Sequence, residues 1–207
     1  RTKIERLIDS SPVVERSSYN DKMSQLFYFR KKLSTAYGEV TSTDPIFIAL
    51  KDTVETFGIQ RQLLDDMISG MEEDFHRNRY QTFEDLYTYC YKVASTVGLV
   101  CIEIYGYEDP RAREFAESWG IYMQLTNIIR DVAEDLERNR IYLPIEDLAR
   151  FGISEDDLHS GKEILKHPGW KPFVSEYIAR AEKYRERAMK LLPLLDKSSR
   201  YSPAAMT

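Results

Sequence analysis

The sequence contains few cysteines and no excess of positive charge. Cys90 and Cys101 are the only cysteines among its 207 residues. Both stand in apolar helical sequence, so no disulfide framework is indicated and a reducing compartment fits best. The net charge is −5, from 29 basic and 34 acidic residues mixed along the chain. A general nucleic-acid binder has a basic patch or stripe, so this charge pattern argues against that class.

Long apolar runs are also missing. A membrane-spanning helix needs a run of about 18 apolar residues or more, and the sequence has none. The opening residues, RTKIERLIDSS, contain no apolar signal core and no initiator Met, so we expect a fragment or a processed chain. Hydrophobic residues still make up 43% of the chain, which is enough for a sizeable core. We therefore expect a cytoplasmic protein.

Strand-like alternation, repeats and low-complexity segments are scarce. The 9 glycines and 8 prolines fall between long segments with helical periodicity, which indicates an all-α fold. Three capping signals mark helix starts: Asp44 before Pro45, Thr82 with Asp85, and Ser154 with Asp157. The expected helices cover approximately residues 21–37, 45–58, 61–76, 82–105, 110–139, 144–150 and 172–195.

The stretch NIIRDVAEDLERNRIYLP, residues 127–144, places much charge beside an apolar helix face. At about 100° per residue, one polar stripe contains Gln124, Asn127, Asp131 and Asp135. It borders the apolar arc formed by Ile121, Leu125, Ile128 and Val132, whereas a merely solvating stripe would lie opposite the core. The more exposed arc is expected to hold Met123, Thr126, Arg130, Ala133 and Glu137.

This stripe has the chemistry of a metal-diphosphate site. Carboxylates at i and i+4 repel each other, so the pair Asp131 and Asp135 is unfavourable by itself. A divalent cation bound between the two carboxylates would make their interaction favourable. Mg²⁺ in proteins takes one or two carboxylates and fills its remaining positions with water and phosphate oxygens. Asn127 can add a neutral oxygen, and the forked donors of Arg130 and Arg140 suit a diphosphate.

A helix laced with salt bridges is the alternative interpretation of the same residues. Acidic and basic side chains at these spacings are common, and each pair contributes little energy. In that interpretation Asp135 pairs with Arg138 or Asn139. Spacing alone leaves both interpretations open.

Two long segments then resemble a known family. YMQLTNIIRDVAEDLERNRIYLP (122–144) resembles the second aspartate-rich signature of the squalene/phytoene synthase family. YCYKVASTVG (89–98) resembles the other signature, with Ser95 where many members have Gly. Residues 70–86 and 105–120 are similar in pattern to bacterial phytoene synthases. The resemblance covers roughly residues 20–207 and is closer to phytoene, dehydrosqualene or hydroxysqualene synthases than to eukaryotic squalene synthases.

The resemblance implies an isoprenoid synthase (terpenoid synthase) helical fold around a central cavity. It also implies a prenyltransferase. Two farnesyl or geranylgeranyl diphosphates would join head to head, through a cyclopropyl diphosphate, into a C30 or C40 product such as phytoene, dehydrosqualene or squalene. The implied cofactor is Mg²⁺, with Mn²⁺ as the alternative ion. A different hypothesis is a non-catalytic helical relative that binds lipid or assembles with a partner, and a weaker one is a one-substrate terpene cyclase or hydrolase.

Carried over position by position, the resemblance assigns roles to eleven residues. Tyr89 would lie near the reacting carbons, although an ordinary core role is the alternative for this tyrosine. Metal binding falls to Asp131 and Asp135 with help from Asn127. The diphosphate end would be lined by Gln124, Arg130, Arg140 and Tyr142, and the prenyl tails would be bordered by Ala94, Val97 and Gly98.

Other titratable residues show weaker patterns. The three histidines have no metal-ligand spacing. Asp65 and Asp66 are adjacent and point about 100° apart on a helix, which indicates solvated side chains. Glu73 and Asp74 are candidates for the cavity mouth.

The chain also departs from the family pattern. We expect one helical domain over residues 1–207 that lacks an N-terminal helix or helices and a C-terminal helix of the family. The place of the family's other aspartate-rich motif holds only Arg6, Ile8 and Asp9 as similar residues, and Pro12 disfavours a helix there. Either upstream residues are missing or one Mg²⁺ site is degenerate. An apolar product is compatible with peripheral contact between the protein and a membrane. The sequence leaves the oligomeric state open.

Overall fold

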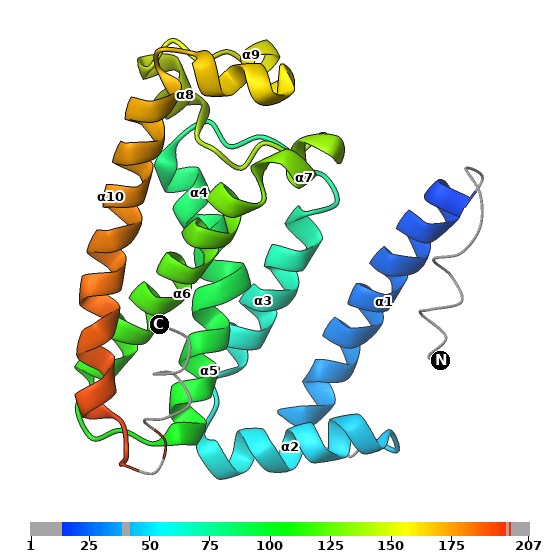
Figure 1. The fold of residues 1–207 in the computed structure, drawn as a ribbon. Coiled ribbons are helices and arrows are strands. Elements are labelled where there is room, and N and C mark those ends of the chain that lie inside the picture. The colour runs from blue at the N-terminus through cyan, green and yellow to red at the C-terminus, as the bar shows by residue number, and fades with distance from the viewer. Residues whose placement is uncertain (1–13, 39–41, 198, 200–207) are drawn as a thin grey trace. The chain divides into compact units, whose positions relative to one another are not determined.

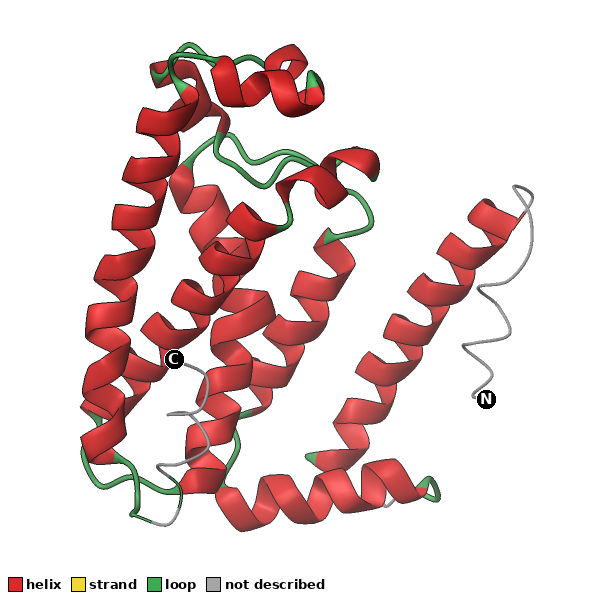
Figure 2. Cartoon of the chain, in the orientation of Figure 1, coloured by secondary structure: helices red, strands yellow, loops and turns green. Residues whose placement is uncertain are grey.

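The computed structural model describes residues 14–38, 42–197 and 199, and within these ranges the chain is helical (Figure 2). The only extended pairing there consists of two isolated bridges, Arg79 with Ile141 and Tyr107 with Leu195. The predicted all-α class is therefore confirmed. No helix in this part of the protein is long and apolar enough to cross a membrane. The residues similar to the N-terminal motif, around Asp9, lie outside the described ranges.

Contacts between residues divide the chain into two compact units, residues 1–61 and 62–207. The first unit contains α1 (Val14–Ala36) and α2 (Pro45–Phe57), which pack against each other. The predicted cap of α2 is present, because Asp44 accepts a hydrogen bond from the backbone N–H of Ile46 and Pro45 occupies the opening turn. Gly58 ends the helix with φ of 63°, a left-handed conformation that suits glycine.

The second unit contains the other helices and carries the candidate site. In sequence order these are α3 (Arg61–Glu73), α4 (Phe83–Cys90), the π-helix η1 (Tyr91–Ser95), α5 (Thr96–Tyr105), α6 (Arg111–Arg130), α7 (Val132–Glu137), α8 (Ile145–Arg150), α9 (Glu155–His159), the 3-10 helix η2 (Gly161–Lys166), α10 (Trp170–Ala188) and the 3-10 helix η3 (Met189–Leu194). Helix α6 is central: α10 runs along it, and η1 and α5 pack on it as well (Figure 1). Both predicted capping boxes, at Thr82 and Ser154, are formed.

The predicted single helix over residues 82–105 is wrong in one detail. A π-helix interrupts it at Tyr91–Ser95, where the backbone N–H of Thr96 bonds to the carbonyl of Tyr91 five residues earlier. The neighbouring helices α3 and α6 each have a glycine where they contact this wider turn, and the missing side chains let the turn pack closely on both helices. A Cβ at Gly70 on α3 would lie 2.7 Å from Cγ1 of Val93, and one at Gly120 on α6 would lie 2.4 Å from the backbone of Ser95. The π-helix is thus packed tightly on two sides.

The predicted helix over residues 110–139 is also interrupted. Asp131 has φ of −100° and ψ of 11°, which ends α6 at Arg130 and separates it from α7. Two backbone bonds still cross the break, from Asp131 to Asn127 and from Asp135 to Asp131, each 2.9 Å long. The acidic pair therefore stays on consecutive turns, but not on one straight helix. The last long helix ends at Ala188 rather than Leu195, and Pro193 stands in the 3-10 turn that follows.

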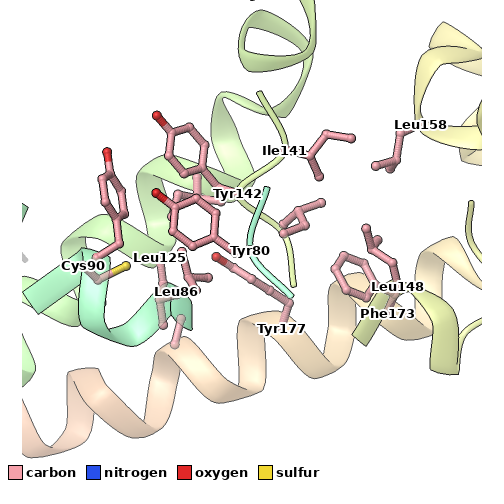
Figure 3. Close-up of a cluster of buried hydrophobic side chains, with 14 of the residues drawn as sticks. Tyr80, Leu86, Cys90, Leu125, Ile141, Tyr142, Leu148, Leu158, Phe173 and Tyr177 are labelled. Atoms are coloured by element: carbon pink, nitrogen blue, oxygen red, sulfur yellow. The ribbon is translucent and has the colours of Figure 1, made fainter. Parts of the chain in front are cut away.

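Two clusters of buried side chains lie against α6. One joins α4 and α6 to α10 and to the loops around Tyr80 and Tyr142, and Figure 3 shows these two rings above the helix that carries Tyr177. The other joins α5 and α6 to the C-terminal η3 segment, with Trp119 and Leu191 among its members. The polar part of the candidate site borders the former cluster, and its apolar part lies in the latter.

Candidate functional site

Asp131 stands at the break between α6 and α7. Arg130 donates from Nε and Nη2 to the two carboxylate oxygens of Asp131, both at 2.7 Å. This bond is the main cause that lowers the pKa of Asp131. Neighbouring side chains on a regular helix point about 100° apart. The ion pair between the neighbours Arg130 and Asp131 therefore occurs where the backbone at Asp131 departs from helical geometry. For Asp131 the salt-bridge interpretation therefore describes the structure. The donors of Arg130 that would suit a diphosphate are bound to the Asp131 carboxylate.

Asp135, one turn later, has a different environment. Its half-buried carboxylate makes no hydrogen bond or ion pair with any side chain in the described ranges. Arg138 pairs with Glu134 instead, at 2.6 Å, and Asn139 accepts from Arg79, at 2.9 Å. The expected alternative partners of Asp135 are therefore wrong. Burial raises the pKa of Asp135, and the negative charge of Asp131 raises it further.

The acidic pair fits a divalent cation in charge and ligand type. The charge of Asp131 makes Asp135 harder to ionise, and a cation between the two carboxylates would relieve that cost. Mg²⁺ needs no more protein carboxylates than these two. The half-buried side chains of Asn127 and Gln124 lie on the preceding turns of α6 and make no side-chain hydrogen bond to another described residue. Among the described residues no group of three or more His, Cys, Asp or Glu side chains forms a metal cluster. A cation here would therefore rely on Asn127, water and a ligand for its other oxygens.

A tyrosine cluster around Asp74 forms the next part of the site. Asp74 follows α3, and its Oδ1 accepts from the hydroxyls of Tyr89, at 2.9 Å, and Tyr142, at 3.1 Å. The ring centroids of Tyr80, Tyr89 and Tyr142 lie 5.2–5.6 Å apart. Figure 3 shows the hydroxyls of Tyr80 and Tyr142 on the same side of their rings. Arg140 completes the cluster by donating to the Asp74 carbonyl at 2.8 Å.

The local sequence explains how Arg140 reaches Asp74. Asn139 has φ of 55°, the left-handed conformation that asparagine tolerates after a helix. The N–H of Arg140 then bonds back to the carbonyl of Asp135 at 2.9 Å and closes α7. The backbone then runs beside residues 78–81, held by a bond from Ile141 to Asn78 of 3.0 Å. Arg140, Tyr142 and Asp135 consequently line one small pocket of about 10 Å³, enough for about one water.

The burial of Tyr89 and the nearby charge of Asp74 determine the protonation state of the Tyr89 hydroxyl. Its side chain is 3% exposed. Burial raises the pKa of Tyr89 well above its usual range, and the nearby Asp74 charge raises it further. The hydroxyl therefore stays protonated and acts as a hydrogen-bond donor with a polarised aromatic face. It is not a base at neutral pH in this arrangement.

An apolar cavity of about 250 Å³ lies beyond the tyrosines, between η1, α5, α6 and the C-terminal turn. The three predicted tail-lining residues are among its walls. The full lining is Val93, Ala94, Val97, Gly98, Cys101, Ile102, Tyr105, Ala116, Trp119, Gly120, Met123, Leu191 and Leu195. Met123 was expected on the exposed arc of its helix, and the structure corrects this: α5 covers that side of α6. Gly98 also serves packing, since a Cβ there would lie 3.1 Å from the carbonyl oxygen of Ala116.

Sequence reasoning missed several of these residues. Asp74 was only a candidate for the cavity mouth, and its contacts with Tyr89 and Tyr142 cross 15 and 68 residues of sequence. No local spacing signals such a partnership. Trp119 and Met123 could be predicted as cavity residues only if the face of α6 that a second helix covers were known. A single sequence does not contain that information.

Comparison with solved structures defines the class of fold. The squalene synthase HpnC from Alicyclobacillus acidocaldarius superposes with a TM-score of 0.78 at 26% identity, over 84% of this chain and 65% of that one. A dehydrosqualene synthase in complex with a ligand gives 0.73 at 29% identity, over 89% of this chain and 63% of that one. The helices therefore form an isoprenoid synthase fold.

Sequence comparison identifies the family. The sequence model of the squalene/phytoene synthase family matches residues 4–207, so the chain belongs to this family. The 15-cis-phytoene synthase of Synechocystis sp. is 43% identical over 170 residues, 76% of this chain and 50% of that protein. Phytoene synthase 1 of Arabidopsis thaliana is 41% identical over 165 residues, 76% of this chain and 38% of that protein. The chain thus spans half or less of the length of these two relatives.

Proposed function

We propose that this chain belongs to an enzyme that joins two prenyl diphosphates head to head into a C30 or C40 product. Phytoene, dehydrosqualene and squalene are products of that kind. Farnesyl and geranylgeranyl diphosphate are the corresponding substrates. The family membership and the names of the relatives support the reaction class, and the site in this chain supports the substrate type. A cytoplasmic location, with peripheral membrane contact for an apolar product, is part of the proposal.

The observation that carries the proposal is the layout of α6 and α7. Their polar end bears Asp131 and Asp135, and the other half of α6 lines the apolar cavity through Trp119 and Met123. Met123 precedes Asp131 by eight residues, or about 12 Å along a helix. A prenyl diphosphate has the same polarity: an anionic head that needs cations, joined to a hydrocarbon tail that needs an apolar wall.

The residues at the polar end suit departure of a diphosphate. Asp131, Asp135 and Asn127 would hold Mg²⁺, which when bound supplies positive charge where the leaving group becomes negative. Arg140 is fixed by the Asp74 carbonyl and can present its remaining donors to phosphate oxygens, as a rigid guanidinium does well. Arg130 can do the same once the Asp131 carboxylate has a cation as its alternative partner. Gln124 lies one turn before Asn127 and would contact the same head group.

The residues beyond this end suit a carbocation. A cation must be kept from water, and aromatic faces attract it. Tyr89 and Tyr142 offer stacked rings next to the polar end, with their hydroxyls directed to Asp74. Because the pKa of Tyr89 is raised, this ring stays neutral and stabilises positive charge without capturing it as a phenolate.

The test is turnover by the full-length protein with Mg²⁺ and each diphosphate. We expect release of pyrophosphate and a C30 or C40 product identified by mass spectrometry. Asp131→Asn and Asp135→Asn should each reduce the rate by at least about 100-fold, because each removes charge placed where the leaving group develops its own. Glu134→Gln, at the exposed position between them, is the matched control. Circular dichroism should show unchanged helix content in all three variants.

Two outcomes would contradict the proposal. Wild-type turnover in both Asp variants would remove the acidic pair from the chemistry. Tight binding of a prenyl diphosphate without any product would leave a lipid-binding relative as the better description of the protein.

A further inference from the structure

Arg79 joins three segments of the second unit through its guanidinium. It donates to both carboxylate oxygens of Glu155, the first residue of α9, at 3.0 Å each. It also donates to the carbonyl of Asn78 at 2.9 Å, to the carbonyl of Asn139 at 2.8 Å and to the side-chain oxygen of Asn139 at 2.9 Å. These bonds use all the N–H donors that a guanidinium has, so Arg79 has none left for a ligand. Any effect of Arg79 on the site must therefore pass through the residues that it binds.

The turn at Asn139 is the segment that Arg79 holds most firmly. Asn139 is exposed and has φ of 55°, a conformation that is unfavourable for every residue except glycine. Arg79 binds both its carbonyl and its side chain, which fixes the peptide plane after Asn139 as well as the side chain itself. Glu155 in turn anchors Arg79 from α9, and α7 and α9 lie at the same end of the second unit (Figure 1). The contacts therefore stabilise a strained turn from outside.

The residue that follows this turn is Arg140. The backbone angles of Asn139 set the direction in which the chain continues, and hence where the Arg140 side chain starts. In the structure that side chain reaches the Asp74 carbonyl and lines the small pocket beside Asp135. If Asn139 relaxed to a right-handed or extended conformation, the Arg140 guanidinium would leave this place.

We propose that Arg79 is a positioning residue for diphosphate binding, which acts by holding Asn139 in its left-handed turn and thereby directing Arg140 at the head group. This inference rests on the proposed function, since it takes Arg140 to contact a diphosphate. Arg79 does not touch the ligand. Glu155 compensates its positive charge, so the contribution of Arg79 is geometric rather than electrostatic.

The test measures the affinity of the full-length protein for inorganic pyrophosphate with Mg²⁺, by isothermal titration calorimetry. Arg79→Ala should weaken binding at least tenfold, the loss expected when a charge-assisted hydrogen bond is no longer held in place. Arg79→Lys should weaken it as much, because lysine keeps the charge but lacks the fork that binds Asn139 and Glu155 together. Arg138→Ala is the matched control. It removes one positive charge directly before the same turn, from a residue that pairs with Glu134, and should change the affinity less than threefold.

Two substitutions of Asn139 separate the turn from the side-chain contact. Asn139→Gly and Asn139→Val both remove the side-chain oxygen that Arg79 binds. Glycine adopts the left-handed conformation readily, so Asn139→Gly should keep the affinity within threefold of the parent. Valine is β-branched and disfavours that conformation, so Asn139→Val should weaken binding at least tenfold. Because Asn139 is exposed, this pair keeps the test valid if Arg79→Ala does not fold.

A double variant tests whether Arg79 acts through Arg140. In an Arg140→Ala background, Arg79→Ala should weaken pyrophosphate binding less than twofold further, because the side chain that it positions is already gone. An equal loss with and without Arg140 would overturn the inference. So would an Arg79→Ala variant that has a lower melting temperature but the parent's affinity, which is the result expected of a salt bridge that only stabilises the fold.

The outcomes separate this inference from the proposed function. Parent-like pyrophosphate affinity in Arg79→Ala and Asn139→Val, beside normal condensation by the parent, would overturn the positioning role and leave the proposed function standing. A parent protein that binds no pyrophosphate would also overturn the positioning role. The expected affinity changes without product from any prenyl diphosphate would support the positioning role and overturn the proposed condensation.

Discussion

Asp74 offers the sharpest test of how the tyrosine cluster is held together. Its Oδ1 accepts hydrogen bonds from Tyr89 and Tyr142, whereas Arg140 binds its backbone carbonyl. Asp74→Ala therefore removes the acceptor shared by the two hydroxyls and leaves the arginine contact with the backbone in place. The loop between α3 and α4 should keep its path.

The expected loss of stability follows from the burial of the two tyrosines. Tyr89 is 3% exposed and Tyr142 is 8% exposed, so water cannot easily replace the lost acceptor. A buried group that loses its hydrogen-bond partner costs about 1–3 kcal/mol. The Tyr89 hydroxyl can turn toward that of Tyr142, so we expect about 2 kcal/mol in total rather than twice the single cost. In a protein of this size that lowers the melting temperature by about 4–8 °C.

A double-mutant cycle with urea unfolding provides the assay. Tyr89→Phe removes the donor but keeps the ring, and Asp74→Ala removes the acceptor. Removing both partners costs less than the sum of the single losses, so we expect a coupling energy of at least about 1 kcal/mol. Single losses that add within about 0.5 kcal/mol would refute the reasoning. Asp52→Ala on an exposed face of α2 is the control and should change stability by less than about 0.5 kcal/mol.

Three further predictions concern stability elsewhere in the second unit. The raised pKa of Asp135 means that the folded protein binds its proton more tightly, so stability falls as pH rises through the range above the usual carboxyl pKa. Asp135→Asn should therefore raise the melting temperature near pH 7 without Mg²⁺, and the gain should vanish near about pH 3; an equal gain at both pH values would contradict this. Asp147 is 5% exposed and accepts from Arg180 at 2.5 Å, whereas Glu176 lies 3.9 Å from the same guanidinium. Asp147→Ala should therefore cost about 2 kcal/mol in urea unfolding, because it removes a hydrogen bond to a charged group and leaves Arg180 only the longer ion pair with Glu176, and a loss under about 1 kcal/mol would count against this. Gly120→Ala should cost about 1–3 kcal/mol in the same assay, because its Cβ would stand 2.4 Å from the Ser95 backbone; a neutral variant would show that the two helices can separate freely.

Features that depend on nearby residues could be predicted from the sequence. Asp44 before Pro45 and Thr82 with Asp85 start helices where expected, because a cap involves side chains and N–H groups two or three residues apart. The apolar arc of α6 was also predicted correctly, since Leu125 and Ile128 are buried. Local periodicity decides which side of a helix faces the core.

Features that depend on contacts between distant segments could not be predicted in the same way. The π-helix at 91–95 fits between Gly70 and Gly120, which lie on two other helices. The partnership of Asp74 with Tyr142 joins two loops that the sequence separates by 68 residues. Helical periodicity reveals neither feature, because each depends on segments that lie far apart in the sequence. The roles of the acidic pair and of Mg²⁺ remain predictions for the experiments above.

The widened turn at 91–95 has a consequence for how the protein tolerates change. Each residue of a helix turns the backbone by about 100°, so one extra residue decides the angular phase of everything that follows it. Deleting a single residue there would leave the segment helical, yet it would swing the row of Val97, Cys101 and Tyr105 away from the hollow while Tyr89 stayed beside Asp74. This turn therefore holds the cavity wall on α5 in register with the tyrosine cluster at Asp74, and short insertions or deletions in this stretch should be far more damaging than substitutions of similar size.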